Sequence, residues 1–432
     1  MLALPMVLEM MMESVFAVAD VFFVARLGAG AVAAVGLTES LLTVIYALAV
    51  GLSMPAAAMV ARRIGEKNPE GAARAAVQGI GASLAVAIVL GITGSLLAPH
   101  LLTLMGADAA VLETGTNYAR ILLASNCVIF MLFLNNAIFR GAGDAAIAMR
   151  VLWIANAINL VLDPCLIFGL GPFPELGLTG AAIATTIGRG TAVLLQLYWL
   201  TNGSRRIHIQ RRHITFDPTI LLRLLKLSIG GVAQNLVATA SWIGLVRITA
   251  AFGSSAVAGY TIAIRLIIFA LLPSWGMSNA AATLVGQNLG AKKPDRAEKS
   301  VWLSGFYNML FLGSVAVIFI LFASPLIKLF TQDPAVIPIA TDGLRIISFG
   351  FIFYAWGMVM VQSFNGAGDT MTPTWVNLFC FWAVQIPLAW WLAKPMGVGP
   401  QGVFWAAAIS YSLEAVVGLL LFRRGTWKKQ VV

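Results

Sequence analysis

The chain has 432 residues, of which 59% are hydrophobic and only 11% are charged. Soluble proteins carry about a quarter charged residues, so this composition excludes a soluble globular protein. The apolar runs are long and do not alternate with polar residues. A backbone surrounded by lipid is satisfied only in helices or in a closed barrel, so we predict an all-α integral membrane protein.

The net charge of +10 reflects 28 Lys and Arg residues, which gather in a few short loops without aromatic residues between them. Twenty of these residues fall in or within a few residues of the connections after every second apolar segment, or in the C-terminal tail, and only three fall in the opposite connections. Basic loops face the cytoplasm. We therefore expect both termini in the cytoplasm and no nucleic acid partner.

Breaks at charged, Gly and Pro residues divide the chain into twelve apolar segments, each long enough to span a bilayer, which takes about 20 residues. The segments are residues 2–25, 31–60, 72–98, 113–138, 147–169, 178–200, 222–252, 255–285, 296–323, 338–363, 371–393 and 401–422. The first segment contains acidic residues and lacks a basic start, so it predicts a retained helix and not a cleaved signal peptide.

The second half of the chain repeats the first in a constant register. GAGAVA at 28–33 falls on GSSAVA at 253–258, and in the same register FRGAGD at 139–144 falls on FNGAGD at 364–369. Further along, a small indel moves Gly177 onto Gly399. This register predicts two copies of a six-helix unit, which share one orientation because six is even, as in the parallel repeats of some secondary transporters.

The repeat predicts an N-terminal six-helix bundle at 1–200 and a C-terminal six-helix bundle at 218–432. Residues 201–217 would form a basic cytoplasmic linker. Its charge suits a contact with anionic lipid or the ordinary role of a basic loop in setting topology. The second interpretation is favoured.

Several functions are disfavoured by what the sequence lacks. It has no GxxxxGK[ST] loop, so transport would draw on an ion gradient and not on ATP. The three cysteines fall inside apolar segments and the three histidines outside them, which disfavours a disulfide framework and an intramembrane metal centre. We expect no enzyme and no cofactor, with H⁺ or Na⁺ as the coupling ion.

Ionisable residues inside a membrane are costly and are the first candidates for function. Glu9, Glu13 and Asp20 lie within about 40° of one another on a helix and form an acidic stripe that cannot face lipid. Asp163 follows Asn159 by four residues, on the same helix face. The proline after Asp163 leaves a carbonyl without its N–H partner, so this face suits a proton or a hard cation.

Asp20 and Asp163 are expected to share one layer of the membrane. Both segments run outward, and the two acids stand five or six residues before the outer end, roughly 8 to 9 Å below it. In the register that places Gly28 on Gly253, the counterparts of Asp20, Asn159 and Asp163 are Leu245, Val384 and Leu388. An acidic cluster in one copy only is what a single coupling site predicts, and we favour this over structural pairing.

Three residues of the first segment are candidates for a substrate cavity. Glu9 and Glu13 could line it, with structural pairing an equal alternative. Met10 belongs to a group of four methionines at residues 6–12, and methionine offers varied ligands an adaptable apolar surface. Ordinary packing is the commoner role of such residues.

The stretch LPMVLEMMMESVFAVADVFFVARLG at residues 4–28, the duplicated GxxxxAAxxVxxxxGxxxP segments and the two GAGD turns resemble the multidrug and toxic compound extrusion (MATE) family. The likeness covers all twelve segments. It implies twelve transmembrane helices in two six-helix bundles, V-shaped with a central cavity. Members of the family export organic, often cationic compounds in exchange for H⁺ or Na⁺.

Within this family the chain resembles the DinF-type branch, whose key ionisable residues lie in the N-terminal bundle. The resemblance implies that Asp20 is the essential acid of the first helix and that Pro5 is the proline at which this helix bends. Asn159 and Asp163 match the amide and the acid of an NxxxDP motif. With Asp20 they would also hold Na⁺, if Na⁺ is the coupling ion.

The resemblance also implies polar neighbours of that pocket. Tyr118 and Asn136 would line it, and Thr185 or Thr186 would supply a hydroxyl. The NorM-type branch carries a Glu in its seventh helix, where this chain offers Gln234 and an asparagine. Coupling through the C-terminal bundle is therefore not expected, and Gln234 is a candidate only for the substrate cavity.

We therefore expect a secondary active multidrug efflux antiporter in the cytoplasmic membrane of a prokaryote. It would act as a monomer among membrane lipids, on drugs or toxic metabolites. One alternative is a lipid-linked oligosaccharide flippase of the same superfamily, which would carry a basic cavity where this chain has acids. The other is a channel or non-transporting membrane protein.

Overall fold

The computed structural model describes residues 2–203 and 206–430. Within this range, the side chains of residues 15–21, 25 and 29 lie outside what it describes. The described backbone consists of helices and short connections, and no strand occurs among these residues. The prediction of an all-α protein is therefore confirmed.

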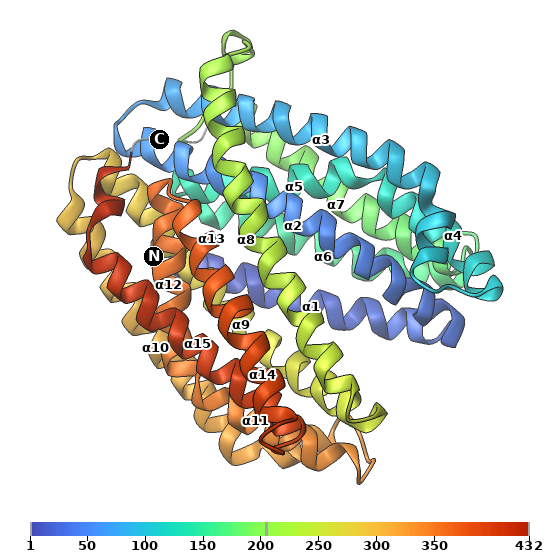
Figure 1. The fold of residues 1–432 in the computed structure, drawn as a ribbon. Coiled ribbons are helices and arrows are strands. Elements are labelled where there is room, and N and C mark those ends of the chain that lie inside the picture. The colour runs from blue at the N-terminus through green and yellow to red at the C-terminus, as the bar shows by residue number, and fades with distance from the viewer. Residues whose placement is uncertain (1, 204–205, 431–432) are drawn as a thin grey trace. The chain divides into compact units, whose positions relative to one another are not determined.

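The described residues of the N-terminal part form seven α-helices, whose course Figure 1 shows. They are α1 (Ala3–Ala25), α2 (Ala29–Gly65), α3 (Pro69–Leu104), α4 (Ala109–Ala124), α5 (Asn126–Ala142), α6 (Ala145–Phe168) and α7 (Leu178–Thr201). Helices α4 and α5 meet at a bend of 44° and together form one span. A short 3₁₀ turn, η1 (Arg211–His213), follows in the linker.

The C-terminal part repeats this order. It contains α8 (Pro218–Ala250), α9 (Ser254–Gly290), α10 (Pro294–Lys328), α11 (Val336–Phe349), α12 (Phe351–Ala367), α13 (Met371–Asn377), the π-helix η2 (Leu378–Gln385), α14 (Ile386–Ala393), α15 (Pro400–Arg423) and the 3₁₀ turn η3 (Thr426–Lys429). Helices α11 and α12 form one span with a bend of 58°. Helix α13, η2 and α14 together form another.

The described helices give the predicted number of spans. Nine are long and apolar enough to cross a membrane, and the two bent pairs raise this number to eleven. Helix α1, an apolar helix of 23 residues, supplies the twelfth. Several helices exceed the expected segments, because α2 and α9 have 37 residues each. At 1.5 Å per residue they are roughly 55 Å long, so their ends project beyond a hydrocarbon core of about 30 Å.

The internal repeat is confirmed by the helix boundaries. Helices α5 and α12 have 17 residues each and begin at Asn126 and Phe351, which are equivalent positions of the repeat. Helices α7 and α15 have 24 residues each and begin directly after Gly177 and Gly399, the two glycines that the indel brings together. The equivalent residues Lys67 and Lys292 both adopt a positive φ, of 59° and 57°. The duplication therefore extends to details of the turns.

The two glycines of each GAGD motif have different roles. Gly143 and Gly368 end their helices with a φ of 89°, a conformation that glycine adopts without steric cost. A Cβ atom on Gly141 would lie 2.6 Å from the backbone oxygen of Ala57, and one on Gly366 would lie 2.2 Å from that of Ala282. The motif is therefore retained in both copies partly because it allows α5 to contact α2, and α12 to contact α9.

Replacing Gly141 or Gly366 with Ala is expected to lower the thermal unfolding temperature of the purified protein. The added methyl group meets backbone, which cannot rotate away, and overpacking of this kind costs about 1–3 kcal/mol. Gly81→Ala in α3 is the control, because its Cβ would meet nothing within 4 Å. Equal unfolding temperatures for G81A, G141A and G366A would contradict the assignment of close packing.

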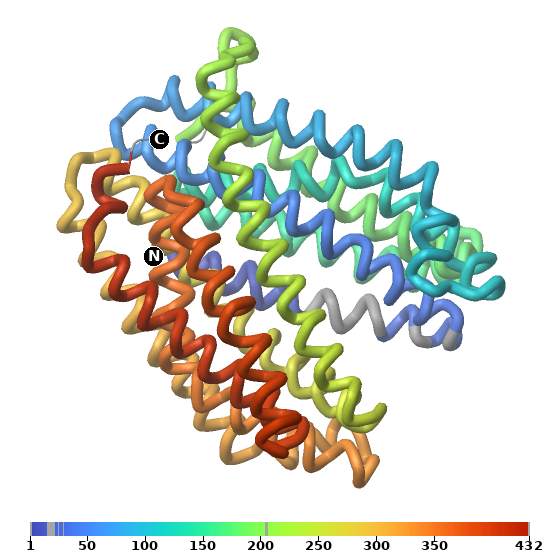
Figure 2. The backbone as a smooth tube through the Cα atoms, in the orientation of Figure 1, coloured from blue at the N-terminus to red at the C-terminus, as the bar shows by residue number. Residues whose placement is uncertain are grey.

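Each part of the chain forms a compact unit, and the division falls at 232/233, inside α8. The sequence placed it at 217/218. The first half of α8 belongs to the N-terminal unit because it packs against α2, where a Cβ on Gly51 would lie 2.5 Å from the backbone nitrogen of Val232. Within each unit the long helices run side by side (Figure 2).

The linker is attached to α3. His213 is buried, and its Nε2 lies 2.7 Å from a carboxylate oxygen of Glu70, which also forms an ion pair with Arg212. Gln78 donates a hydrogen bond to the backbone oxygen of Thr215. Part of the basic charge of the linker is therefore engaged within the protein.

Candidate functional site

Helix α6 carries three buried polar side chains on one face. Asn156, Asn159 and Asp163 are spaced by three and four residues, which places them on one face of a helix. Pro164 lies inside the helix and has no N–H to donate to the carbonyl four residues earlier. The sequence therefore places a carboxylate, two amides and a free carbonyl on one side of α6.

Asp163 and Asn159 contact each other, as the spacing predicts. The amide of Asn159 is best satisfied when its NH₂ donates to Oδ2 of Asp163 over 2.7 Å. Its oxygen then accepts from the backbone N–H and the hydroxyl of Thr185 on α7, each at 3.1 Å. Asp163 is fully buried, so these contacts build a polar cluster across α6 and α7.

The structure distinguishes the two threonines that the sequence left as alternatives. Thr185 contacts Asn159, whereas the hydroxyl of Thr186 donates to the backbone oxygen of Ala182 in its own helix. The approach of the two helices depends on Gly188, because a Cβ there would lie 2.7 Å from the backbone oxygen of Ala155. Thr185 is therefore the hydroxyl of this cluster.

A second polar contact lies in the same unit. Gln196 of α7 is fully buried, and its NH₂ donates to Oδ1 of Asn136 on α5 over 2.6 Å. Sequence reasoning missed Gln196, although it lies three helical turns after Thr185 on the same face. Tyr118 of α4 is also buried. Asn136 is thus hydrogen-bonded to Gln196, a partner the sequence did not suggest.

The side chain of Asp20 lies outside the described residues, so its predicted contact with Asp163 stays a prediction. Helix α1 packs along α6, where Trp153 donates a hydrogen bond to the backbone oxygen of Leu8. Helix α1 ends at Ala25 and α6 at Phe168. Both acids therefore stand five residues before a helix end, about 7–8 Å along the axis.

The other two acids of the predicted stripe have basic partners. Glu9 is buried, and its Oε1 lies 2.8 Å from Nη1 of Arg140 on α5. Glu13 is about one-third exposed and lies 3.9 Å from Arg189 on α7, which also donates to the hydroxyl of Tyr46. Both acids therefore have a basic partner in the structure, and their place in a substrate cavity stays a prediction.

The described contacts of three further candidate residues are local contacts within the protein. Met10 is half-buried, and its backbone oxygen accepts a hydrogen bond from Ser14. Pro5 lies in the first turn of α1, where a helix has no backbone acceptor for the N–H that proline lacks. Gln234 belongs to the C-terminal unit, is buried, and accepts a hydrogen bond from Asn377 at its backbone oxygen.

The π-helix changes which residues are equivalent in the two copies of the repeat. Up to Cys380 the buried positions keep the register of the repeat, and beyond η2 they are displaced by one position. The counterparts of Asn159 and Asp163 are therefore Gln385 and Ala389, and the sequence-based choice of Val384 and Leu388 was wrong. The π-helix accommodates the inserted position. The C-terminal unit still has no acid at the position of Asp163.

Among the described residues, no group of three or more His, Cys, Asp or Glu side chains gathers as a metal site would. The side chain of Asp20 lies outside the described residues, and the described groups beside the carboxylate of Asp163 are amide, hydroxyl and carbonyl oxygens. Such neutral oxygens suit Na⁺ or a proton better than a transition metal.

The MatE family model matches the chain twice, at residues 5–165 and at residues 232–391, once in each copy of the repeat. The chain belongs to the MatE family. It is therefore a multi-pass membrane transporter and not an enzyme. The match does not assign a branch within the family, so the DinF-type assignment stays a prediction.

Individual relatives match nearly the whole chain. The "Probable multidrug resistance protein NorM" of Thermotoga maritima is 27% identical, over 100% of this chain and 93% of its own length. The "FAD transporter" of Shewanella oneidensis is 26% identical, over 90% of this chain and 86% of its own length. A solved structure of a multidrug resistance MATE family transporter has a TM-score of 0.93 and 28% identity, over 99% and 96% of the two chains.

Proposed function

We propose that this transporter exports organic, often cationic compounds in exchange for H⁺ or Na⁺, and that Asp163 binds the driving ion together with Asp20. The observation that carries the proposal is the position of Asp163, fully buried in a membrane span and hydrogen-bonded to Asn159. A buried intramembrane carboxylate is costly, and such residues mark ion pathways. Relatives named for multidrug resistance support the substrate class.

Neutralisation of charge is the proposed coupling step. With Asp163 ionised, α6 and α7 hold a negative charge in a low-dielectric layer, and binding of a cation removes the cost of that charge. A proton needs only the carboxylate. Na⁺ needs about six oxygens, which would come from Asp163, the hydroxyl of Thr185, the free carbonyl of α6, Asp20 and water. Ion binding would then change the position of α1 and release the drug outward.

The proposed setting is the cytoplasmic membrane of a prokaryote, with both termini in the cytoplasm. The basic loops support this orientation through the positive-inside rule. The transporter would act as a monomer surrounded by lipid and would use no cofactor besides the coupling ion.

The test uses purified protein in liposomes, with pH and Na⁺ gradients imposed separately and ethidium as the transported compound. We expect ethidium to move against its own gradient under one of the two ion gradients and not without it. FAD, an anion, is the comparison compound, and its export in place of ethidium would contradict the proposed substrate class. Movement of ethidium only down its own gradient would indicate a channel.

The two adjacent threonines of α7 allow a matched test of the site. Thr185→Val is expected to weaken binding of the driving ion by about tenfold, because a hydrogen bond in such a network contributes about 1–1.5 kcal/mol. Thr186→Val should bind the ion like the wild type, because this hydroxyl bonds only to its own helix in the described contacts. The measurement is the ion concentration that gives half-maximal ethidium export, and equal values for T185V and T186V would remove Thr185 from the site.

A further inference from the structure

Among the described residues of the C-terminal unit, one acid is buried, and the proposed site does not use it. Glu414 lies near the middle of α15 and is only 4% exposed. Its Oε2 atom is buried and has no hydrogen-bond partner among the described residues. An ionised carboxylate without a partner in a membrane span costs several kcal/mol. A cation must therefore accompany this group whenever it stands in this position.

The space for this carboxylate is provided by a glycine on the neighbouring helix. A Cβ atom on Gly357 of α12 would lie 3.4 Å from Oε2 of Glu414. In the N-terminal unit, the positions equivalent to Glu414 and Gly357 in the repeat are Ala192 and Leu132. In the C-terminal copy the first of these helices carries the small residue and the second the large one, and in the N-terminal copy the order is reversed. The site of the acid therefore belongs to the C-terminal unit alone.

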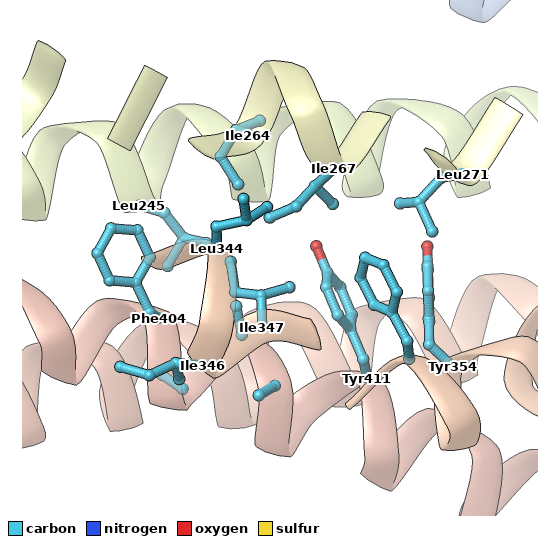
Figure 3. Packing of buried hydrophobic residues seen from close by; sticks show 14 of the residues in the cluster. Leu245, Ile264, Ile267, Leu271, Leu344, Ile346, Ile347, Tyr354, Phe404 and Tyr411 are labelled. Carbon is cyan, nitrogen blue, oxygen red and sulfur yellow. The ribbon is translucent and has the colours of Figure 1, made fainter. Parts of the chain in front are cut away.

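Aromatic residues pack together on the two helices that meet at Glu414, α12 and α15. Tyr354 of α12 and Tyr411 of α15 stack at 4.2 Å between ring centroids, and Phe381 meets Tyr411 edge-on at 6.0 Å. Both tyrosine hydroxyls point toward the helix that carries Ile267 and Leu271 (Figure 3). Together with the thiol of Cys380 on η2, the two tyrosines lie within electrostatic range of the carboxylate.

The charged side chains on the helices packed against α15 have other described partners or lie at its end. Arg345 of α11 donates to the backbone oxygen of Ile320, and Asp342 accepts from Gln401. Lys428 of η3 pairs with Glu298, and Arg423 is the last residue of α15. No basic partner for Glu414 occurs among the described contacts.

We propose that Glu414 is a proton-binding carboxyl of the C-terminal unit, separate from the Asp163 site. A proton fits because it needs one oxygen only, whereas a metal ion would need about six. The buried hydroxyl of Ser410, one turn earlier on α15, also has no hydrogen-bond partner among the described residues. The π-helix η2, a local form often found at functional sites, packs against α15 and carries the buried Cys380.

Infrared spectroscopy of the purified protein tests the chemical part of this proposal without transport. Wild-type protein at neutral pH should show the C=O stretching band of a protonated carboxylic acid that is missing in Glu414→Gln and disappears reversibly on alkaline titration. Asp163→Asn should keep this band. The proposal is overturned if E414Q retains the band, if the band persists at every pH, or if Na⁺ at constant pH removes it.

The functional part rests on the proposed exchange of drug for a cation. Ethidium export by E414Q should depend less steeply on pH than wild-type export, because one proton-binding group is lost. A merely structural role would instead change the rate by the same factor at every pH, and this result would overturn the functional part. If neither wild type nor E414Q exports ethidium, the proposed function fails, while the infrared result still decides whether Glu414 binds a proton.

Discussion

Asp163→Asn is expected to abolish ethidium export driven by an ion gradient. Asparagine has nearly the shape of aspartate and retains an oxygen that accepts from Asn159, so the helix packing around α6 should persist. It carries no charge, so the driving cation loses its counter-charge inside the membrane, where an unpaired ion is most costly. Export against the gradient should fall to the level of empty liposomes. Asp20→Asn is expected to have the same effect.

The control for this experiment is Asp342→Asn, which removes a partly exposed acid that accepts from Gln401. It should export ethidium like the wild type. Thermal unfolding of all variants in detergent shows whether they are folded. Full export by a folded D163N would reject Asp163 as the binding group and would leave the transporter without an assigned coupling residue in α6.

Arg140→Ala is expected to destabilise the N-terminal unit by about 3–5 kcal/mol, because it leaves the carboxylate of Glu9 buried without its partner. The two groups are 2.8 Å apart, with only 1% of the Glu9 side chain and 14% of the Arg140 side chain exposed. Since this pair connects α1 to α5, its loss should also loosen α1. The measurement is the thermal unfolding temperature of the purified protein.

Two variants separate the charge effect from loss of packing. Arg189→Ala removes the ion pair with Glu13, in which the two charged groups are 3.9 Å apart and the Glu13 side chain is about one-third exposed. This change should lower the free energy of unfolding by less than about 1 kcal/mol. Adding Glu9→Gln to R140A should recover most of the lost stability, because no unpaired charge then stays buried. If E9Q/R140A unfolds at the temperature of R140A, loss of packing and not an unpaired charge explains the effect.

The contacts of the site differ in whether a sequence pattern can predict them. The contact between Asn159 and Asp163 follows from a spacing of four on one helix, and the structure confirms it. The partners on other helices do not follow from such spacing. The hydrogen bond from Gln196 to Asn136 and the ion pair of Glu9 with Arg140 join residues 60 and 131 positions apart, and only the packing of helices brings them together.

Hydrophobic segments, basic loops and the register of the internal repeat were enough to predict twelve spans and a duplicated unit, because lipid forces every spanning backbone into a helix and duplication leaves its glycines in register. Contacts between helices were decided by tertiary packing. The π-helix η2 shifts the register between the two copies by one position, so the counterpart of Asp163 is Ala389 and not Leu388. The surroundings of Glu414 do not follow from its own helix, because Gly357 on another helix provides the space for its carboxylate. Shape complementarity between helices depends on side chains that are distant in sequence, and no local pattern encodes it.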